Sequence, residues 1–251
     1  MGAVDNSTQA RWPFTLVLIP GLVNTARVWS AQLPGLSARV HTCVAEHQKG
    51  ARSLATMASV VLEQVSGPLA LAGHSMGGRI ALEVARQAPE RIVGLALLDT
   101  GYCSLPEGPA GSSEIVRRLA LVELARRQGM RAMLQEWIRG MVAPARLADC
   151  ELVEGVIGMM ATNSADDFAA QVDALIHRPD ASDVLTRFRG PALVLCGAED
   201  AWAPPAQHVA LAELLADAEC HVLADCGHMA PMERPEETLA HLLDWIQRLG
   251  V

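Results

Sequence analysis

The sequence predicts an α/β fold with a mostly parallel central sheet that is flanked by helices. Short apolar segments typical of strands alternate with helical segments over residues 1–100, and this alternation returns over residues 190–251. Residues 101–189 instead form a succession of helical segments rich in Ala, Leu, Met and Arg. Such alternation is typical of a parallel sheet with helices on both faces. We therefore predict a core of residues 1–100 and 190–251 with a helical cap inserted at 101–189.

The first part of the core is predicted to contain four strands and two helices. Its central strands are continuous apolar runs, which predicts burial on both faces of the sheet. In chain order we expect strands over 14–19 and 40–45, a helix over 53–65, a strand over 69–72, a helix ending near residue 87, and a strand over 93–98.

The cap is predicted from segments with helical composition, and the second part of the core is predicted from the return of strand-like apolar runs. The closing helix carries Trp245 on its apolar face, which predicts packing against the sheet. We expect cap helices over 115–128, 131–140 and 150–161, then a strand over 190–196, a helix over 207–216, a strand over 220–223 and a helix over 235–249.

Composition excludes several classes of protein. The 251 residues are 51% hydrophobic and carry a net charge of −8, with 20 scattered basic residues, so a nucleic-acid partner is not expected because phosphate binding needs clustered Lys and Arg. No apolar run approaches the ~20 residues that span a bilayer, and residues 1–10 lack the pattern of a signal peptide. The six cysteines lie far apart and suggest neither a metal site nor disulfides. These features predict a cytoplasmic protein with no membrane partner.

The most informative motif is Gly73-His74-Ser75-Met76-Gly77, which joins an apolar strand to an amphipathic helix. This pattern is typical of a nucleophile elbow, in which a serine on a strained turn presents its hydroxyl at the end of the sheet. Glycine on either side removes the side chains that would block so sharp a turn. Ser75 is therefore the candidate nucleophile.

Two further strand ends supply an acid and a base. Asp200 follows the strand at 190–196, and His228 follows the last strand. The chain order Ser75, Asp200, His228 at successive strand ends predicts a catalytic triad. Asp99, after the strand at 93–98, and Glu199 are alternative acids.

Neighbouring titratable residues receive simpler assignments. Asp225 is expected to be a turn residue, and His74 a hydrogen-bonding neighbour rather than the base. Cys226, two residues before His228, would need exposure and electropositive surroundings to act as a nucleophile.

Together these motifs resemble the α/β-hydrolase fold family, and in particular its small esterase-like serine hydrolases. The resemblance covers nearly the whole chain: Pro20-Gly21-Leu22 stands at the oxyanion loop, Gly73–Gly78 at the elbow, Gly197–Pro204 at the acid loop and Gly227-His228 at the histidine loop. The sequence departs from the family in two places. Pro20 stands where the family often has His, and residues 46–53 keep little of the family's Asp-x-x-Gly-x-Gly-x-Ser loop.

The resemblance implies a serine hydrolase that cleaves a small or medium carboxylic ester through an acyl-enzyme, with no cofactor or metal. The backbone N–H groups of Leu22 and Met76 would form its oxyanion hole. The same triad also serves carbon–carbon bond hydrolases of ring-cleavage products and enol-lactonases, which remain the alternative. A non-catalytic ligand-binding protein on the same fold is an alternative of another class.

The cap is expected to supply the substrate pocket. Its methionines and Trp137 suit either an adaptable apolar lining or ordinary core packing. Arg139 and Arg178 would suit an anionic substrate, although a solvated face is the default expectation. The methionines in question are Met130, Met133, Met141, Met159 and Met160.

Overall fold

A computed structural model describes residues 13–47 and 51–250. Its centre is a six-stranded sheet with the order β2-β1-β3-β4-β5-β6, in which every described strand pair is parallel. This arrangement confirms the predicted fold class. The strands are β1 (Thr15–Ile19), β2 (His41–Val44), β3 (Leu69–His74), β4 (Ile92–Leu98), β5 (Ala192–Gly197) and β6 (Ala218–Leu223).

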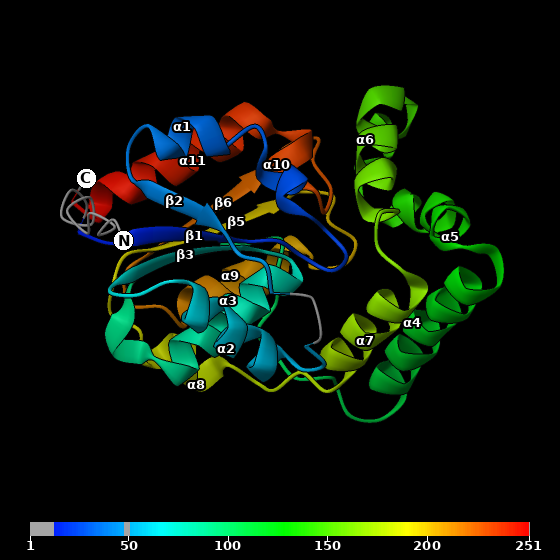
Figure 1. The fold of residues 1–251 in the computed structure, drawn as a ribbon, viewed down its shortest axis with the longest axis horizontal. Coiled ribbons are helices and arrows are strands. Elements are labelled where there is room, and N and C mark those ends of the chain that lie inside the picture. Colours follow the sequence, from blue (N-terminus) through cyan, green and yellow to red (C-terminus); the bar gives the residue numbers. More distant parts are fainter. Residues whose placement is uncertain (1–12, 48–50, 251) are drawn as a thin grey trace, which may run out of the picture.

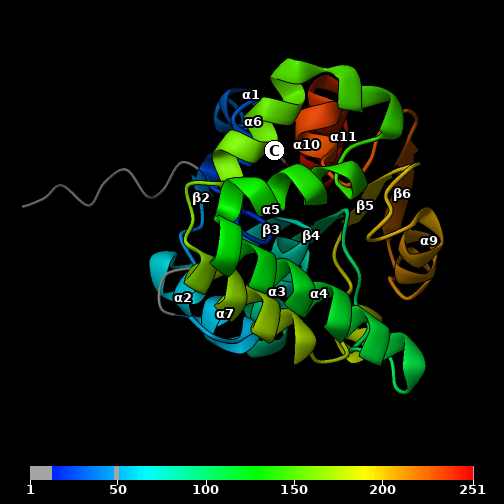
Figure 2. The ribbon, with the colours of Figure 1, turned by 90° about the vertical axis from the view of Figure 1, so that its right-hand side faces the viewer.

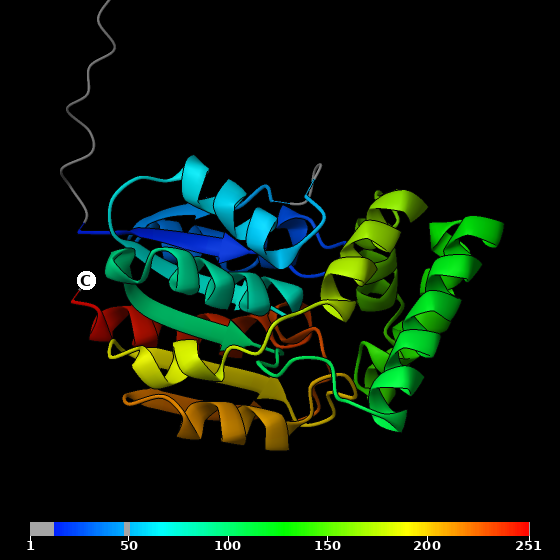
Figure 3. The same ribbon diagram turned by 90° about the horizontal axis from the view of Figure 1, so that it is seen from below.

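Helices cover both faces of this sheet (Figures 1 and 3). On one face lie α2 (Leu54–Gln64), α3 (Met76–Gln87), α8 (Ser182–Arg187) and α9 (Pro205–Glu213), and on the other lie α1 (Leu33–Ser37) and α11 (Pro235–Arg248). Every residue of β3 and β5 is buried between these layers. On α11 the indole of Trp245 is fully buried, and its Nε1–H donates to the Pro191 carbonyl at 3.1 Å. The expected apolar face of the closing helix is therefore confirmed.

Four helices stand together beyond the carboxyl ends of the strands (Figures 1 and 2). They are α4 (Pro109–Gln128), α5 (Met130–Trp137), α6 (Cys150–Met160) and α7 (Ala165–Ile176). The short α8 belongs to the segment 101–189 in sequence but packs against α3 of the core. The division of the chain at residues 101 and 189 remains a prediction.

Glycines mark where α4 begins and where it gives way to α5. The first was expected at residue 115 but begins at Pro109, after Gly108 at φ 71°. Gly129, at φ 87°, ends α4, and α5 follows at once. The predicted helix 131–140 is a shorter α5 that tightens into a 3₁₀ turn at Ile138–Gly140. The other short elements are 3₁₀ turns at Ala26–Trp29, Pro89–Arg91 and Pro144–Ala148, and α10 (Ala230–Glu233).

Two sequence-based expectations fall partly outside the described residues. The segment 1–10, whose sequence lacks the pattern of a signal peptide, lies outside them, as do residues 48–50 of the loop 46–53. Within 13–47 and 51–250, no helix combines the length and apolar character that crossing a membrane requires.

Candidate active site

Ser75 sits on a strained turn between β3 and α3. Its backbone adopts φ 55° and ψ −120°, a region that L-residues rarely occupy. A Cβ on Gly73 would lie 2.3 Å from the Gly77 carbonyl oxygen, and one on Gly77 would lie 2.0 Å from the Ile19 carbonyl oxygen. Both positions therefore require glycine. The turn is held by hydrogen bonds from the Ser75 N–H to the Leu98 carbonyl at 2.8 Å and from the Thr100 hydroxyl to the Ser75 carbonyl at 2.7 Å.

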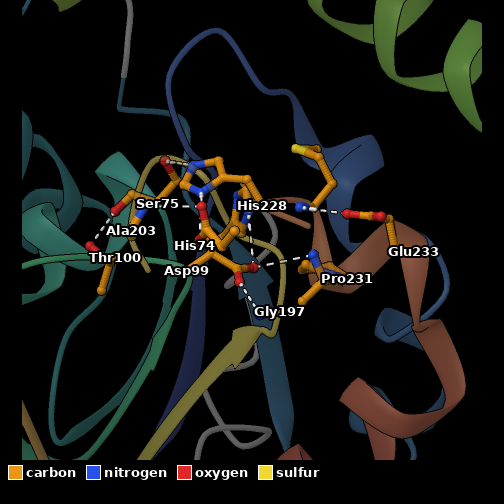
Figure 4. Close-up of polar contacts among 12 residues, drawn as sticks. His74, Ser75, Asp99, Thr100, Gly197, Ala203, His228, Pro231 and Glu233 are labelled. Carbon is orange, nitrogen blue, oxygen red and sulfur yellow. Dashed lines mark hydrogen bonds and ion pairs between the residues drawn. The ribbon is translucent and has the colours of Figure 1, made fainter. Parts of the chain in front are cut away.

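The structure brings Ser75, His228 and Asp200 into one chain of hydrogen bonds. The Ser75 hydroxyl donates to His228 Nε2 at 2.8 Å (Figure 4). On the other side of the ring, His228 Nδ1 lies 2.8 Å from Asp200 Oδ2 and 2.9 Å from Oδ1. Asp200 Oδ1 also accepts from the backbone N–H groups of Trp202 and Ala203 at 2.8 and 2.9 Å. The carboxylate is thus fixed in the orientation that holds the imidazole.

Burial and charge shift the pKa values of His228 and Asp200 in opposite directions. Burial of the imidazole lowers the pKa of His228, but the charge of Asp200 and its hydrogen bond outweigh burial and raise that pKa above the ordinary 6.5. Burial likewise raises the pKa of Asp200, yet His228 and the two backbone donors bring it below its ordinary value. Asp200 is therefore ionised at neutral pH and stabilises a protonated His228.

The alternative acid, Asp99, lies behind the site instead of on the imidazole. Its two oxygens accept from the N–H groups of Gly197 at 3.1 Å and Ala230 at 3.2 Å, and Nε2 of His74 lies 3.5 Å from its Oδ2. Asp99 therefore joins the loops after β5 and β6 (Figure 4). Glu199 contributes a backbone N–H to the Cys226 carbonyl, and its side chain is exposed.

His74 supports the triad without joining it. Its Nε2–H donates to the His228 carbonyl at 2.8 Å, and its Nδ1 lies 3.2 Å from the Asn24 amide nitrogen. The fully buried ring thus links the elbow to the histidine loop and the loop after β1. Asp225 is an exposed turn residue at φ 47°, as predicted.

The loop after β1 lies directly against the elbow. A Cβ on Gly21 would lie 3.0 Å from Ser75 Cβ, so a larger residue would have to displace the loop or the elbow slightly. Leu22 follows, and Met76 is the first residue of α3, where helix N–H groups lack partners within the helix. Both residues line the same cavity as Ser75 and His228. Their N–H groups remain the candidate oxyanion hole.

These features agree with a comparison with known families, in which residues 12–241 match the model of the alpha/beta hydrolase family. The chain belongs to the alpha/beta hydrolase family. It is also similar to a thermophilic esterase from Thermogutta terrifontis, solved with malate bound: 26% identity and a TM-score of 0.83, over 96% of this chain and 92% of that one.

The curated relatives carry out different reactions. The chain is 30% identical over 183 residues to the dihydrolipoyllysine-residue acetyltransferase component of an acetoin cleaving system from Pseudomonas putida. The aligned residues cover 71% of this chain and 45% of that protein. The chain thus spans less than half the length of that relative. It is 28% identical over 178 residues to a 2-succinyl-6-hydroxy-2,4-cyclohexadiene-1-carboxylate synthase from Salmonella arizonae, covering 69% of this chain and 67% of that protein.

In this alpha/beta hydrolase, the buried Glu233, which the sequence analysis did not identify, connects the loop that carries His228 to the cap by hydrogen bonds. Glu233 Oε1 accepts from the N–H groups of Gly227 at 2.9 Å and Met229 at 3.1 Å, and Oε2 accepts from Ala143 at 2.8 Å. The His228 N–H also donates to the cap carbonyl of Met141 at 2.8 Å. The position of the imidazole therefore depends on how the cap is docked.

We expect Glu233→Gln to lower Tm and kcat together. An amide keeps one acceptor oxygen and turns the other into a donor that faces a backbone N–H. One buried unsatisfied pair costs about 1–3 kcal/mol, which corresponds to a Tm decrease of about 2–12 °C at this chain length. Differential scanning calorimetry and kinetics on any cleaved ester would measure both effects. The exposed Glu63→Gln on α2 is the matched control, and an unchanged Tm for Glu233→Gln would contradict the assignment.

The cap also contributes to the wall of the cavity that holds Ser75. Trp137, Met141 and Met160 line it, whereas the other three methionines singled out in the sequence are buried in the core of the molecule. Two of the five methionines therefore line the cavity, and the other three are ordinary core residues. The expectation of a solvated Arg178 is wrong, because its side chain is only 6% exposed and paired with Glu114. Arg139 is exposed, as expected.

Other nucleophilic or metal-binding chemistry finds no support among the described residues. Cys226 is fully buried, and this burial strongly raises the pKa of its thiol, which disfavours the reactive thiolate. Within 13–47 and 51–250, no three His, Cys, Asp or Glu side chains gather as a metal site would require.

Proposed function

We propose that this protein hydrolyses carboxylic esters through an acyl-enzyme on Ser75. The observation that carries the proposal is the hydrogen-bonded chain from the Ser75 hydroxyl through His228 to Asp200, with distances of 2.8 Å at each link. Nucleophile, base and orienting acid are thereby in the geometry that acyl transfer needs. The likeness to the Thermogutta terrifontis esterase supports the same reaction class.

In the proposed reaction, Ser75 Oγ attacks the acyl carbon as His228 Nε2 takes its proton. The oxyanion that forms would accept hydrogen bonds from the N–H groups of Met76 and Leu22, each such donor contributing about 3–4 kcal/mol. His228 then returns the proton to the departing alcohol. In the second half, water attacks the acyl-enzyme and gives a proton to His228 Nε2. His228 returns that proton to Ser75 Oγ as the acyl–oxygen bond breaks, which releases the carboxylic acid and restores the free Ser75 hydroxyl.

A fluorophosphonate probe followed by an ester panel tests this proposal. The probe should label Ser75 in the folded protein, as shown by peptide mass spectrometry, and Ser75→Ala should remain unlabelled. A panel of acyl esters of graded chain length then tests ester cleavage. Absence of labelling would favour a non-catalytic binding protein. Labelling without cleavage of any ester, together with cleavage of dienoic ring-cleavage products or enol-lactones, would favour the alternative reaction.

The pH profile should report His228 as the base. Only the neutral imidazole can accept the Ser75 proton, so kcat/KM should rise with pH through one ionisation. Because the pKa of His228 is raised, the midpoint should lie above 6.5. Initial rates between pH 5 and 9 would measure it. His228→Ala should abolish this rise with most of the activity, whereas His74→Ala should retain its shape; the opposite pattern would disprove the assignment of the base.

A further inference from the structure

The cavity at Ser75 adjoins a second, outer cavity that is rich in arginine. Four side chains line both cavities: Arg79, Arg118, Trp202 and Gln207. Arg117 and Arg178 also line the outer one. A substrate that reaches Ser75 from the outer cavity therefore passes between guanidinium groups.

Among the described residues that line the outer cavity, Glu114 is the only one with a carboxylate side chain. Arg178 binds it with both terminal nitrogens, at 2.8 and 2.9 Å, and Arg118 Nε adds a third contact at 2.8 Å. Burial tends to raise the pKa of Glu114, but the two arginines bring it to about 2, so the group is ionised at neutral pH. One negative charge is thus shared by two cations, and positive charge remains in excess.

Arg79 contributes to this excess most clearly. Within the described residues it forms one hydrogen bond, from Nη1 to the Cys103 carbonyl at 2.9 Å, and no ion pair. Its other terminal nitrogen, Nη2, lies 2.9 Å from the point that a Cβ on Gly101 would occupy, and Gly101 lines the cavity of Ser75. Burial and the charges of Arg178 and Arg118 lower the pKa of Arg79 to about 9, so it is still a cation at neutral pH. A partly buried cation without a carboxylate is costly, and an anionic ligand would relieve that cost.

The arginines lie close to the nucleophile. Arg79 lies in the first turn of α3, four residues after Ser75, and both side chains line the same cavity. The Arg118 guanidinium carbon lies 5.7 Å from the ring centre of Trp202, within reach of a cation–π contact, and both side chains line the two cavities. Arg118 Nε is bound to Glu114, while its terminal nitrogens make no hydrogen bond with the described residues.

We propose that the substrate of this site bears a carboxylate that Arg79 and Arg118 bind while its reactive carbonyl lies at Ser75. This inference rests on the proposed function, whose substrate class it names. The planar guanidinium matches a carboxylate with two parallel N–H donors, a geometry that a lysine could not supply. The two arginines bind and orient the substrate and take no part in the proton transfers.

Binding of simple dicarboxylates tests the subsite without requiring turnover. Succinate, glutarate and adipate would be titrated into wild type at pH 7 by calorimetry, with glutaramide as the uncharged counterpart. We expect binding of at least one acid and none of the amide. Arg79→Met and Arg118→Met should each weaken that binding about tenfold or more, since a hydrogen bond to a charged group is lost. Arg127→Met, on an exposed part of α4, is the control.

Thermal unfolding separates loss of the subsite from loss of the fold. Arg79→Met removes a cation that lacks a carboxylate partner, and the Cys103 carbonyl keeps a contact from Arg178 Nε at 3.3 Å. The unliganded Arg79→Met should therefore melt no lower than wild type, while glutarate should raise Tm in wild type and not in the variant. Should Arg79→Met fail to fold, Arg79→Lys keeps the charge without the two-pronged donor and should also bind more weakly.

Matched esters connect the subsite to catalysis. Monoethyl adipate carries the carboxylate on the acyl side and 4-acetoxybutanoate on the alcohol side, and each has a carboxamide analogue of similar shape. We expect kcat/KM to favour the carboxylate in one of the two pairs by about tenfold or more, and Arg79→Met to abolish that preference. Equal rates for acid and amide in both pairs, with no binding of any dicarboxylate, would overturn the inference while leaving ester hydrolysis intact. Failure of the fluorophosphonate to label Ser75 would overturn the proposed function instead, and dicarboxylate binding would still decide the subsite.

Discussion

Ser75→Ala should lower kcat by at least about 10³-fold while the protein folds normally. The substitution removes the only atom that can form the acyl-enzyme, the Oγ that lies 2.8 Å from His228 Nε2. The contacts that hold the turn use the Ser75 backbone, because its N–H and carbonyl bind Leu98 and Thr100. These contacts survive the substitution, so Tm should change little.

Initial rates on the best ester of the panel, with calorimetry on the same samples, would measure both quantities. Ser66→Ala, at an exposed position before β3, is the matched control and should match wild type in both. Activity of Ser75→Ala within tenfold of wild type would remove Ser75 as the nucleophile. A large Tm decrease would instead show that the hydroxyl supports the fold.

Asp200→Asn should lower kcat by about 10⁴-fold, the effect of presenting the wrong tautomer of the base. Oδ1 of Asp200 accepts from two backbone N–H groups, so the asparagine oxygen will occupy that position. Its NH₂ then replaces Oδ2, which lies 2.8 Å from His228 Nδ1. That NH₂ donates to Nδ1, so the ring proton moves to Nε2. The protonated Nε2 can no longer accept a hydrogen bond or a proton from the Ser75 hydroxyl.

Asp99→Asn is the comparison that decides between the two acids. Asp99 binds backbone N–H groups of Gly197 and Ala230 and makes no hydrogen bond with the His228 ring. Its substitution should lower Tm, because one buried acceptor is lost, and should lower kcat far less than Asp200→Asn does. Rates and melting curves for the two variants on one ester would give the ranking. A greater loss of kcat for Asp99→Asn than for Asp200→Asn would transfer the role of the acid to Asp99.

Much of the core and the positions of the candidate triad could be predicted from the sequence because they depend on local patterns. Strand-like runs that alternate with helices require a parallel sheet, and the carboxyl ends of parallel strands meet at one edge. Ser75, Asp200 and His228 each follow such a strand, so their proximity follows from topology. Gly73 and Gly77 are equally local, since each is required by the turn of which it is part.

The cap was less predictable for a physical reason. Helical periodicity identifies apolar faces but does not state which partner each face covers. The helices α7 and α8 fall within the predicted helical segment, but their bounds were not predicted, and α4 begins six residues before its predicted start because Gly108 and Pro109 set its first turn. Whether a cap methionine lines the cavity or the core also depends on how the helices dock.

What the sequence by itself determined is therefore the sheet, the strained elbow and the chain order of the candidate nucleophile, acid and base. Tertiary structure alone decided that Asp200 and not Asp99 reaches the imidazole, that Glu233 joins the histidine loop to the cap, and that Arg79 and Arg118 face the same cavity as Ser75. Each of these outcomes is a contact between segments far apart in the chain. Such contacts are selected by packing and by the need to satisfy buried polar groups, and neither leaves a periodic signal in the sequence.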